Sequence, residues 1–276
     1  MRPSFFIIGA NKCGTSSLYR YILANPQVLP CAKKEPNFFG QHSAAYIAGH
    51  IDEYFSLFPT CDYRGPLTFM WEASDEAGTS HLTTIVIERR PGGHYITGEA
   101  SANTFHDVTP SLLHRYLPDT RLIVLVRNPV DRAYSHHCMY QRFRDAGHDL
   151  GVAIGDFAQD IRAEIAAHER GERTEYVGPG IYAELLRGWI TTYGGNRVKV
   201  ILTEDLGRPQ TAEQIMHELE EYLGLPAHDY ADILTRRFNC ARTRSIDPAT
   251  RSLLADFYRP HNAWLQEYLG RKLDWG

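Results

Sequence analysis

The strongest constraint on the fold of this chain is the stretch FFIIGANKCGTSSLYRYIL, residues 5–23. The apolar run from Phe5 to Ile8 is typical of a buried parallel strand, and Gly9 ends it. An amphipathic helix is predicted from Ser16 to the approach to Pro26. A glycine loop joins the two, and the helix N-terminus points at whatever the loop holds. The stretch favours an anion site, and a simple glycine turn between two core elements is the alternative.

This loop departs from the usual nucleotide-triphosphate loop at one position. In the pattern G-x-x-x-x-G-K-[ST], backbone N–H groups cradle the phosphates and the lysine after the second glycine reaches the outer ones. Gly9 and Gly14 keep the spacing, but Thr15 occupies the lysine position and Lys12 lies inside the loop. The lysine available to a ligand of this loop is therefore Lys12, inside the loop, and not the residue after the second glycine.

The rest of the chain alternates strand and helix signals, which predicts an α/β fold with a P-loop-like parallel sheet flanked by helices. With 276 residues and 43% hydrophobic content, we expect one domain over residues 1–276. An irregular insertion is expected at about 60–95, around one strand at 83–88. Further strands are predicted at 94–101, 120–127 and 197–206, and helices at 51–58, 109–118, 130–144, 154–169, 179–193, 211–223 and 248–269.

Composition and charge exclude several classes of protein. A formal net charge of -4 gives no electrostatic case for a nucleic-acid or anionic-membrane partner. No apolar run approaches the roughly 20 residues of a membrane span, and the first strand leaves no room for a signal peptide, so a cytoplasmic location is expected. The 5 cysteines and 13 histidines show no metal-ligand spacing, and the adjacent His136 and His137 would point to different sides of a helix. No metal is expected.

Several motifs together resemble those of a known protein family. The segments "GANKCGTSSLYRY", "KEPNFF" and "RLIVLVRNPVDRAYSHH" occur in this order, followed by "GIYAELLRGW", "VILTEDL" and "LEEYLGLP". This set resembles the sulfotransferases that use 3'-phosphoadenosine 5'-phosphosulfate (PAPS) and release adenosine 3',5'-bisphosphate (PAP). It is most similar to the carbohydrate, heparan-type and bacterial natural-product enzymes. The likeness spans nearly the whole chain apart from the insertion.

The resemblance gives the displaced lysine a role. A transferred sulfuryl group carries less negative charge than a terminal phosphoryl group, so its transfer needs less Mg²⁺ bridging. Lys12 is then the cation that stabilises charge on the departing 5'-phosphate, which raises the rate because this charge grows in the transition state. By analogy with the family, the loop that holds the 5'-phosphosulfate comprises Cys13, Gly14, Thr15, Ser16 and Ser17.

A second motif corresponds to the site of the ribose 3'-phosphate. The resemblance implies that Arg127 and Ser135 bind this phosphate, and an arginine fork suits bidentate phosphate binding. Without the family likeness, an arginine at a strand end is as often part of a surface ion pair. The segment "CARTRSIDP" is similar to the cofactor-covering loop of the family, which makes Arg242 and Arg244 further candidate phosphate contacts.

The acceptor hydroxyl must lose its proton to a base. Glu35 in "KKEPNFF" matches the general base of the heparan-type enzymes, with Lys34 as a candidate substrate contact and His106 as the reserve base. The alternative is that Glu35 only pairs with a lysine in a solvent-facing loop. The chain also departs from the family at "GEASANTF", where Ala100 replaces a lysine, so a second catalytic cation comes from elsewhere or is absent. Ser101 remains a candidate contact to the sulfate or the acceptor.

The predicted activity is therefore metal-independent, in-line sulfuryl transfer from PAPS to an acceptor hydroxyl. The acceptor is a saccharide or another small molecule, as in natural-product tailoring. Trp71 in the insertion is a candidate wall of its site, and packing or a dimer contact would explain this residue equally well. The alternative functions are a small-molecule kinase that uses ATP and Mg²⁺ and a non-catalytic PAP-binding module. No oligomeric state follows from these residues.

Overall fold

The protein was examined as a computed structural model, which describes residues 1–60, 67–74, 80–87, 94–236, 238 and 245–275, with only the backbone described in 67–74 and 80–87. Its contacts divide the chain into two compact units. The first comprises Met1–Leu125 and Trp189–Arg242, and the second comprises Val126–Gly188 and Thr243–Gly276.

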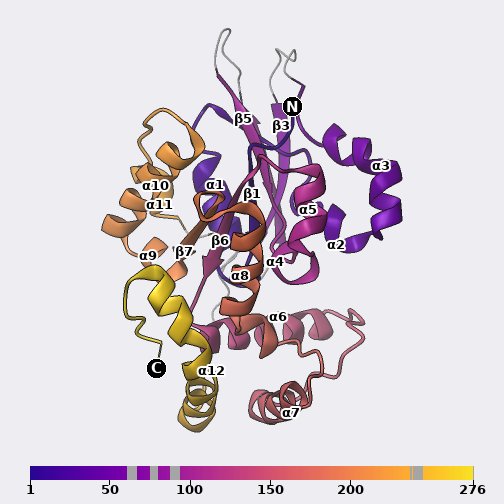
Figure 1. The fold of residues 1–276 in the computed structure, drawn as a ribbon, viewed down its shortest axis with the longest axis vertical. Helices are drawn as coiled ribbons and strands as arrows, with labels where there is room; N and C mark the ends of the chain where they lie inside the picture. Colours follow the sequence, from indigo (N-terminus) through magenta and orange to yellow (C-terminus); the bar gives the residue numbers. More distant parts are fainter. Residues whose placement is uncertain (61–66, 75–79, 88–93, 237, 239–244, 276) are drawn as a thin grey trace. The chain divides into compact units, whose positions relative to one another are not determined.

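The first unit is built on a five-stranded sheet, and its parallel pairing confirms the predicted α/β class (Figure 1). The strands, in spatial order, are β2 (Val28–Pro30), β5 (Ile96–Ala100), β1 (Phe5–Gly9), β6 (Arg121–Val126) and β7 (Val198–Leu202). β2 pairs with β5, β5 with β1 and β1 with β6, all in parallel. Every residue of β1, β2 and β5 is buried, as expected of parallel strands covered on both faces.

Helices flank this sheet. In Figure 1, α9, α10 and α11 lie to the left of the strands and α2, α3 and α5 to the right. α8 (Tyr182–Tyr193) crosses the division between the units. The helices that lie wholly within the first unit are α1 (Thr15–Ile22), α2 (Phe38–Gln41), α3 (Ala44–Ser56), α4 (Thr104–Asp107), α5 (Pro110–Tyr116), α9 (Thr203–Leu206), α10 (Pro209–Leu223) and α11 (Ala231–Leu234).

α3 begins earlier than the helix predicted at 51–58. Ser43 caps it by accepting a hydrogen bond from the Tyr46 N–H at 3.3 Å. Inside the helix, His50 has a non-helical backbone (φ -129°), which kinks it. The predicted helix corresponds to the part after this kink, and the capped part before it was missed.

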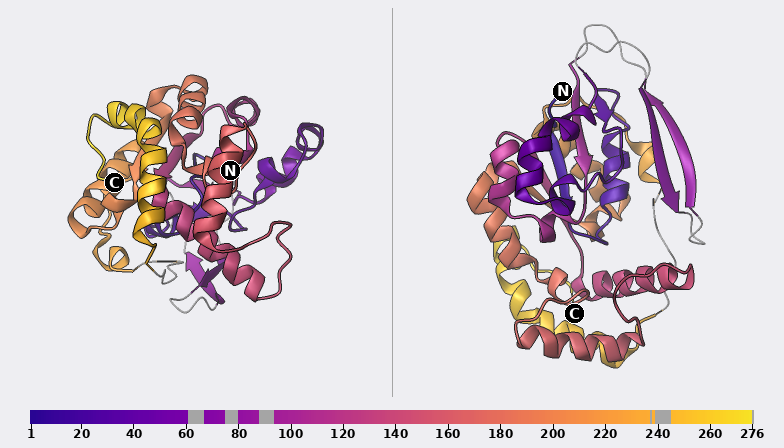
Figure 2. Two further views of the ribbon diagram at one scale, coloured as in Figure 1. Left: turned by 90° about the horizontal axis from the view of Figure 1, so that it is seen from below. Right: turned by 90° about the vertical axis from the view of Figure 1, so that its right-hand side faces the viewer.

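The segment predicted as an irregular insertion with one strand contains two. β3 (Leu67–Ser74) and β4 (Ser80–Ile87) form an antiparallel hairpin, in which Leu67 lies opposite Ile87 and Ser74 opposite Ser80. Figure 2 shows the two as long antiparallel arrows. The paired positions contain no proline or glycine, the chain breakers that suggested irregular structure in this segment.

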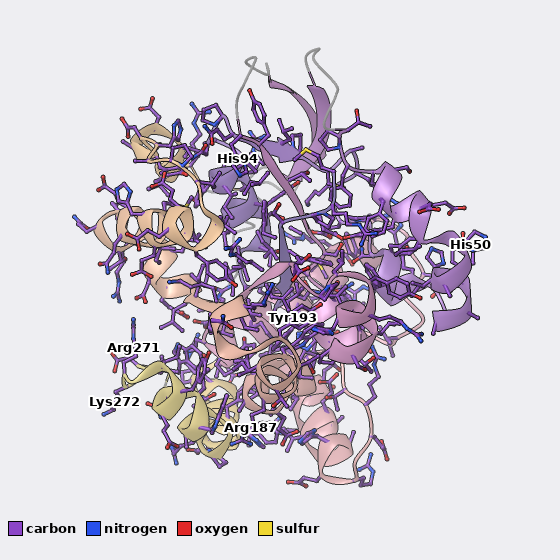
Figure 3. The ribbon with its side chains drawn as sticks, turned by 45° about the horizontal axis from the view of Figure 1, so that its top comes forward. His50, His94, Arg187, Tyr193, Arg271 and Lys272 are labelled. Carbon is purple, nitrogen blue, oxygen red and sulfur yellow. The ribbon has the colours of Figure 1, made fainter. Side chains whose placement is uncertain are left out.

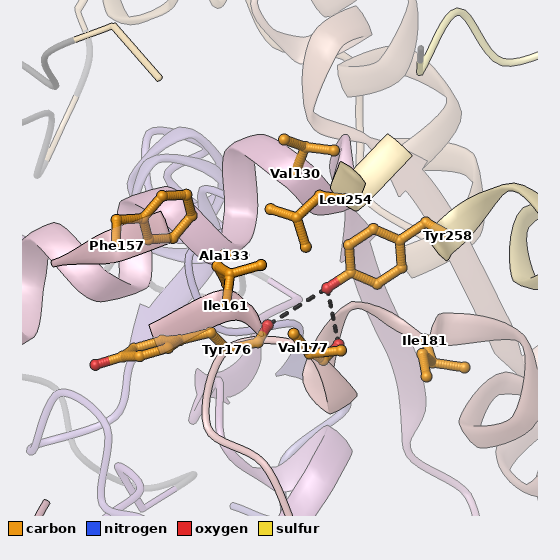
Figure 4. Close-up of a cluster of buried hydrophobic side chains, with 9 residues drawn as sticks. All are labelled: Val130, Ala133, Phe157, Ile161, Tyr176, Val177, Ile181, Leu254 and Tyr258. Carbon is orange, nitrogen blue, oxygen red and sulfur yellow. Dashed lines mark hydrogen bonds between the residues drawn. The ribbon is translucent and has the colours of Figure 1, made fainter. Parts of the chain in front are cut away.

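The second unit is helical. It contains α6 (Pro129–Asp145), α7 (Phe157–Glu169), the 3₁₀ turn Gly178–Gly180 and α12 (Pro248–Leu269). The Tyr258 hydroxyl donates to the Val177 carbonyl oxygen at 2.8 Å inside the core (Figure 4). This core consists of Val130, Ala133, Phe157, Ile161, Tyr176, Val177, Ile181, Leu254 and Tyr258. Among the described residues, no helix combines the length and apolarity needed to cross a bilayer.

Candidate functional site

Three loops of the first unit gather at the carboxyl edge of the sheet. They follow β1, β2 and β5, and two hydrogen bonds tie them together. Asn11 Nδ2 donates to Asn103 Oδ1 at 3.0 Å, which joins the loop after β1 to the loop after β5. The Asn37 N–H donates to Ser101 Oγ at 3.1 Å, which joins the loop after β2 to the same segment. This edge is where open α/β sheets bind ligands.

The backbone of the loop after β1 is held in an unusual conformation. Lys12 has φ 68° and Gly14 has φ 89°, both in the left-handed region. Glycine adopts this region readily, whereas a residue with a Cβ atom costs about 1–2 kcal/mol there. Such strain persists only where the surroundings enforce it, and it clusters at functional sites. The backbone of Lys12 is therefore held in place within the loop.

Neighbouring elements supply the restraint on this loop. The Ala10 N–H donates to the Leu125 carbonyl oxygen of β6 at 2.8 Å, and the Cys13 N–H donates to the Ala10 carbonyl oxygen at 3.1 Å. Thr203, at the start of α9, donates its hydroxyl to the Cys13 carbonyl oxygen at 2.6 Å. The carbonyl group of Cys13 is thereby bonded to Thr203, on the side of α9.

α1 begins directly after this loop and directs its N-terminus to the same edge. Its first intrahelical bond runs from the Leu18 N–H to the Gly14 carbonyl oxygen, and the first amides of a helix have no intrahelical acceptor. The amides of Thr15, Ser16 and Ser17 belong to this group, and a helix start of this kind is suited to binding an anion. The Ser17 hydroxyl is engaged elsewhere, because it donates to the Phe238 carbonyl oxygen at 3.2 Å and accepts from the Phe238 N–H at 3.1 Å.

Glu35 lies in the loop after β2, also in a left-handed backbone conformation (φ 48°). Its side chain is 38% exposed, and its Oε1 lies 3.7 Å from the Lys34 ammonium. The lysine pairing considered from the sequence thus exists. A pair this open to solvent contributes little to stability, so the pairing alone does not explain why a strained backbone is kept here.

A buried carboxyl group that the sequence analysis missed lies beside this loop. Glu99 in β5 is 1% exposed and accepts hydrogen bonds from the Tyr54 hydroxyl and the Ser101 hydroxyl, each at 2.6 Å. Burial raises the pKa of Glu99 to about 7, against the opposing effect of these two donors. A charged residue inside the strand "ITGEA" was the available signal, because a buried strand position is rarely acidic.

Two further candidates of this unit, His106 and Trp71, lie in α4 and β3. His106 lies in α4, half-buried, with its ring 5.0 Å from that of Phe105. Trp71 lies in β3 opposite Thr83, and its side chain is outside the described part of the chain. The predicted phosphate contacts Arg242 and Arg244 also lie outside the described residues.

The candidate ligands of the 3'-phosphate belong to the second unit. Arg127 directly follows β6 and is half-buried, and its carbonyl oxygen accepts a hydrogen bond from the Tyr182 hydroxyl at 2.9 Å. Asn128 caps α6 by accepting from the Val130 N–H at 3.0 Å. Ser135 lies on α6 and is half-buried.

Within the part of the chain that the structure describes, no group of three or more His, Cys, Asp and Glu side chains gathers as a metal site. This finding concerns protein ligands only. The predicted independence from metal ions stays a prediction.

Comparisons with known proteins agree on one family. The sulfotransferase family model matches residues 3–185. Human carbohydrate sulfotransferase 15 is 24% identical over 312 residues, which cover 97% of this chain and 53% of that protein. The human bifunctional heparan sulfate N-deacetylase/N-sulfotransferase 3 is 27% identical over 296 residues, which cover 97% of this chain and 30% of that protein. The chain thus spans about half, or less, of the length of these relatives.

Solved structures share the fold. A sulfotransferase from Alicyclobacillus acidocaldarius superimposes with a TM-score of 0.68 and 24% identity, over 100% of this chain and 99% of that one. A mouse sulfotransferase in complex with PAP gives a TM-score of 0.55 and 13% identity, over 98% of this chain and 90% of that one. At these identities the likeness establishes the architecture.

Proposed function

Because this chain belongs to the sulfotransferase family, we propose that it transfers the sulfuryl group of PAPS to an acceptor hydroxyl without a metal ion. The observation that carries this proposal is the loop of residues 9–17. It combines a lysine inside the loop with the first amides of a helix, which have no acceptor within that helix. This donor set fits a phosphosulfate, and it differs from an ATP site at the lysine.

Lys12 acts on the leaving group in this proposal. As the bond between sulfur and the bridging oxygen breaks, negative charge develops on the 5'-phosphate, and the Lys12 ammonium stabilises it. A cation that is already held in place needs no reorganisation at that moment, so it favours the transition state over the ground state. The strained backbone at Lys12 supports such a preorganised role.

Cofactor selection is assigned to Arg127 and Ser135, which bind the ribose 3'-phosphate by guanidinium and hydroxyl donors. A 3'-phosphate distinguishes PAPS from ATP. The family membership of residues 3–185, which include both side chains, supports this assignment, as does the PAP complex of the mouse relative.

Glu35 takes the proton of the acceptor hydroxyl as the new oxygen–sulfur bond forms. The names of the relatives, a carbohydrate sulfotransferase and a heparan sulfate N-sulfotransferase, support a saccharide as the acceptor class. A small natural product is the second acceptor class. Both present a hydroxyl group that a carboxylate base can activate.

The experiment that tests the proposal compares melting temperatures with PAP, with ATP and Mg²⁺, and without ligand. PAP at about 100 times its Kd stabilises the native state by about 2.7 kcal/mol, which raises the melting temperature by several degrees. The shift should persist in EDTA. It should be lost in Arg127→Ala and kept in Arg121→Ala, the matched control at the exposed start of β6.

Two other outcomes would change the proposed function. A shift only with ATP and Mg²⁺ would overturn it in favour of a kinase. A PAP shift without turnover of PAPS on any sugar or small-molecule hydroxyl would favour a PAP-binding module. Glu35→Ala separates enzyme from module, because in the enzyme it loses turnover and keeps the PAP shift.

A further inference from the structure

Burial of the Glu99 carboxyl group is energetically costly. A buried carboxyl group loses its hydration, and a protein compensates with hydrogen bonds or a partner charge. Glu99 has two hydroxyl donors, Tyr54 on Oε1 and Ser101 on Oε2, and no salt bridge to it occurs among the described residues. Burial without a cation is an expensive arrangement, which points to a role beyond packing.

Ser101 extends this network to the loop that carries the proposed base. Its Oγ donates to Glu99 and at the same time accepts the Asn37 N–H. Asn37 (φ 50°) and Glu35 (φ 48°) are both left-handed, and Asn37 Nδ2 donates to the Glu35 carbonyl oxygen at 3.1 Å. The chain of contacts therefore runs from Glu99 through Ser101 and Asn37 to the backbone of Glu35.

We propose that Glu99 is a positioning residue for Glu35, acting through Ser101 and Asn37. It holds the strained backbone of residues 35–37 so that the Glu35 carboxylate stays in its working position. The inference rests on the proposed function, because Glu35 is the base of that reaction. In this proposal Ser101 connects Glu99 to residues 35–37, because its hydroxyl group is hydrogen-bonded to both Glu99 and the Asn37 amide.

The charge state of Glu99 is set by groups from several elements. Burial raises the pKa values of the tyrosine hydroxyls and of the Cys31 thiol, so these groups are neutral near pH 7. The negative charge of Glu35 disfavours ionisation of Glu99 and so raises its pKa further. The groups concerned are Tyr19 of α1, Cys31 after β2, Glu35, Tyr54 of α3 and, acting on Tyr54, Tyr193 of α8 (Figure 3).

Ionised Glu99 matches the observed donors better than its neutral form. Both carboxylate oxygens face an O–H group, so ionised Glu99 accepts from both at once. A protonated oxygen would have to donate instead, and its hydroxyl partner would have to turn and accept. The positioning network is therefore complete when Glu99 is ionised. It is weakened when Glu99 is protonated.

The test compares Glu99→Gln and Ser101→Ala with Thr97→Val. Thr97 is a matched control, because it lies on the same face of β5, is fully buried and donates its hydroxyl to the Leu29 carbonyl oxygen at 2.9 Å, away from residues 35–37. For each variant we would measure kcat and KM with PAPS and an accepted hydroxyl substrate from about pH 5.5 to about pH 9. Hydrogen exchange of the Asn37 amide and the Kd of PAP complete the set.

Glu99→Gln should lower kcat on the order of 10- to 100-fold with an unchanged Kd for PAP, the scale expected when a catalytic group is misplaced. The rise of kcat through about pH 7 in the wild type should be absent in this variant. Ser101→Ala should give a similar loss of kcat, and both variants should expose the Asn37 amide to exchange. Thr97→Val should keep kcat and the exchange rate.

Wild-type kcat and an unchanged pH profile in both Glu99→Gln and Ser101→Ala would overturn the inference. A protected Asn37 amide in both variants would do the same, even if activity fell. If the wild type transfers no sulfuryl group at all, it is the proposed function that fails. The exchange measurement then still decides whether Glu99 holds the loop.

Discussion

At the scale of single residues, the proposed chemistry depends most on Lys12. We expect Lys12→Ala to lower kcat on the order of 100- to 1,000-fold, as for the loss of one transition-state donor, with at most a moderate loss of PAP affinity. Because Lys12 has φ 68°, alanine keeps the strain of the left-handed backbone while it removes the charge. Lys12→Gly removes the charge and relieves the strain, so it should be as inactive as Lys12→Ala.

Steady-state kinetics and PAP titration check this expectation. Lys199→Ala is the control for the loss of a lysine. Lys199 lies on β7, and its ammonium group pairs with the Glu218 carboxylate at 2.6 Å. This variant should retain activity. Near-normal kcat in Lys12→Gly would remove the lysine from the mechanism and leave the loop backbone as the catalytic element.

The site residues predicted from the sequence, which stay predictions, come from stretches in which the residues are close together along the chain. Lys12 and the amides of α1 lie in one continuous stretch, and Glu35 was recognised from a short motif. Glu99 was missed because its partner Tyr54 is 45 residues away, and a pattern within β5 cannot reveal which side chains the fold brings to it. Buried polar networks of this kind depend on tertiary contacts.

At the scale of secondary-structure elements, the junction between β1 and α1 depends on Gly14. We expect Gly14→Ala to destabilise the protein by about 1–2 kcal/mol, because alanine at φ 89° carries the cost of the left-handed region. The added Cβ would lie 3.6 Å from Thr203 Cγ2, an ordinary contact, so crowding adds little. Chemical denaturation measures this difference.

Gly49→Ala is the matched control for the substitution of a glycine. Gly49 lies inside α3, and a Cβ there would meet no atom within 4 Å among the described residues. Alanine is favoured over glycine in a helix by about 0.5–1 kcal/mol, so this variant should be slightly more stable than the wild type. Equal destabilisation of both variants would show that backbone conformation at Gly14 is not the cause.

Elements with strong local signals were predicted well, and the errors have physical causes. β6 was predicted from a continuous apolar run, and α12 was predicted with its observed bounds, Pro248–Leu269. α3 was predicted only in part, because Gly49 and the kinked His50 interrupt its pattern. The strand β3 was missed because antiparallel pairing with β4, which specifies it, is not encoded within β3 itself.

At the scale of the whole molecule, Glu99 should make stability depend on pH. Its pKa of about 7 in the folded protein lies above the ordinary 4.5, so the folded state binds this proton more tightly. The free energy of unfolding therefore falls as the pH rises from 4.5 to about 7, by about 3 kcal/mol from this group, and is then constant. Glu99→Gln lacks this dependence.

Thermal or urea unfolding of both proteins at pH 5 and pH 8 measures this effect. The stability of the wild type relative to Glu99→Gln should be greatest at pH 5 and should decline by pH 8. Other titrating groups are common to both proteins and cancel in the difference. A difference that stays constant over this range would contradict ionisation of Glu99 inside the folded protein.

The first unit consists of two segments that are separated along the chain, so it can be completed only after its second segment has been synthesised. α1 is bonded to the chain near residue 238, through Ser17 to Phe238 and through Tyr21 to Arg236, across separations of 221 and 215 residues. Contacts of this range form slowly, because the loop between them must close first. The loop of residues 9–17 and α1 leave the ribosome well before residues 236 and 238, so α1 cannot form these contacts until the later residues have been synthesised. A nascent chain that stalls before residue 236 should thus bind PAP poorly although it already carries Lys12, Glu35 and Arg127.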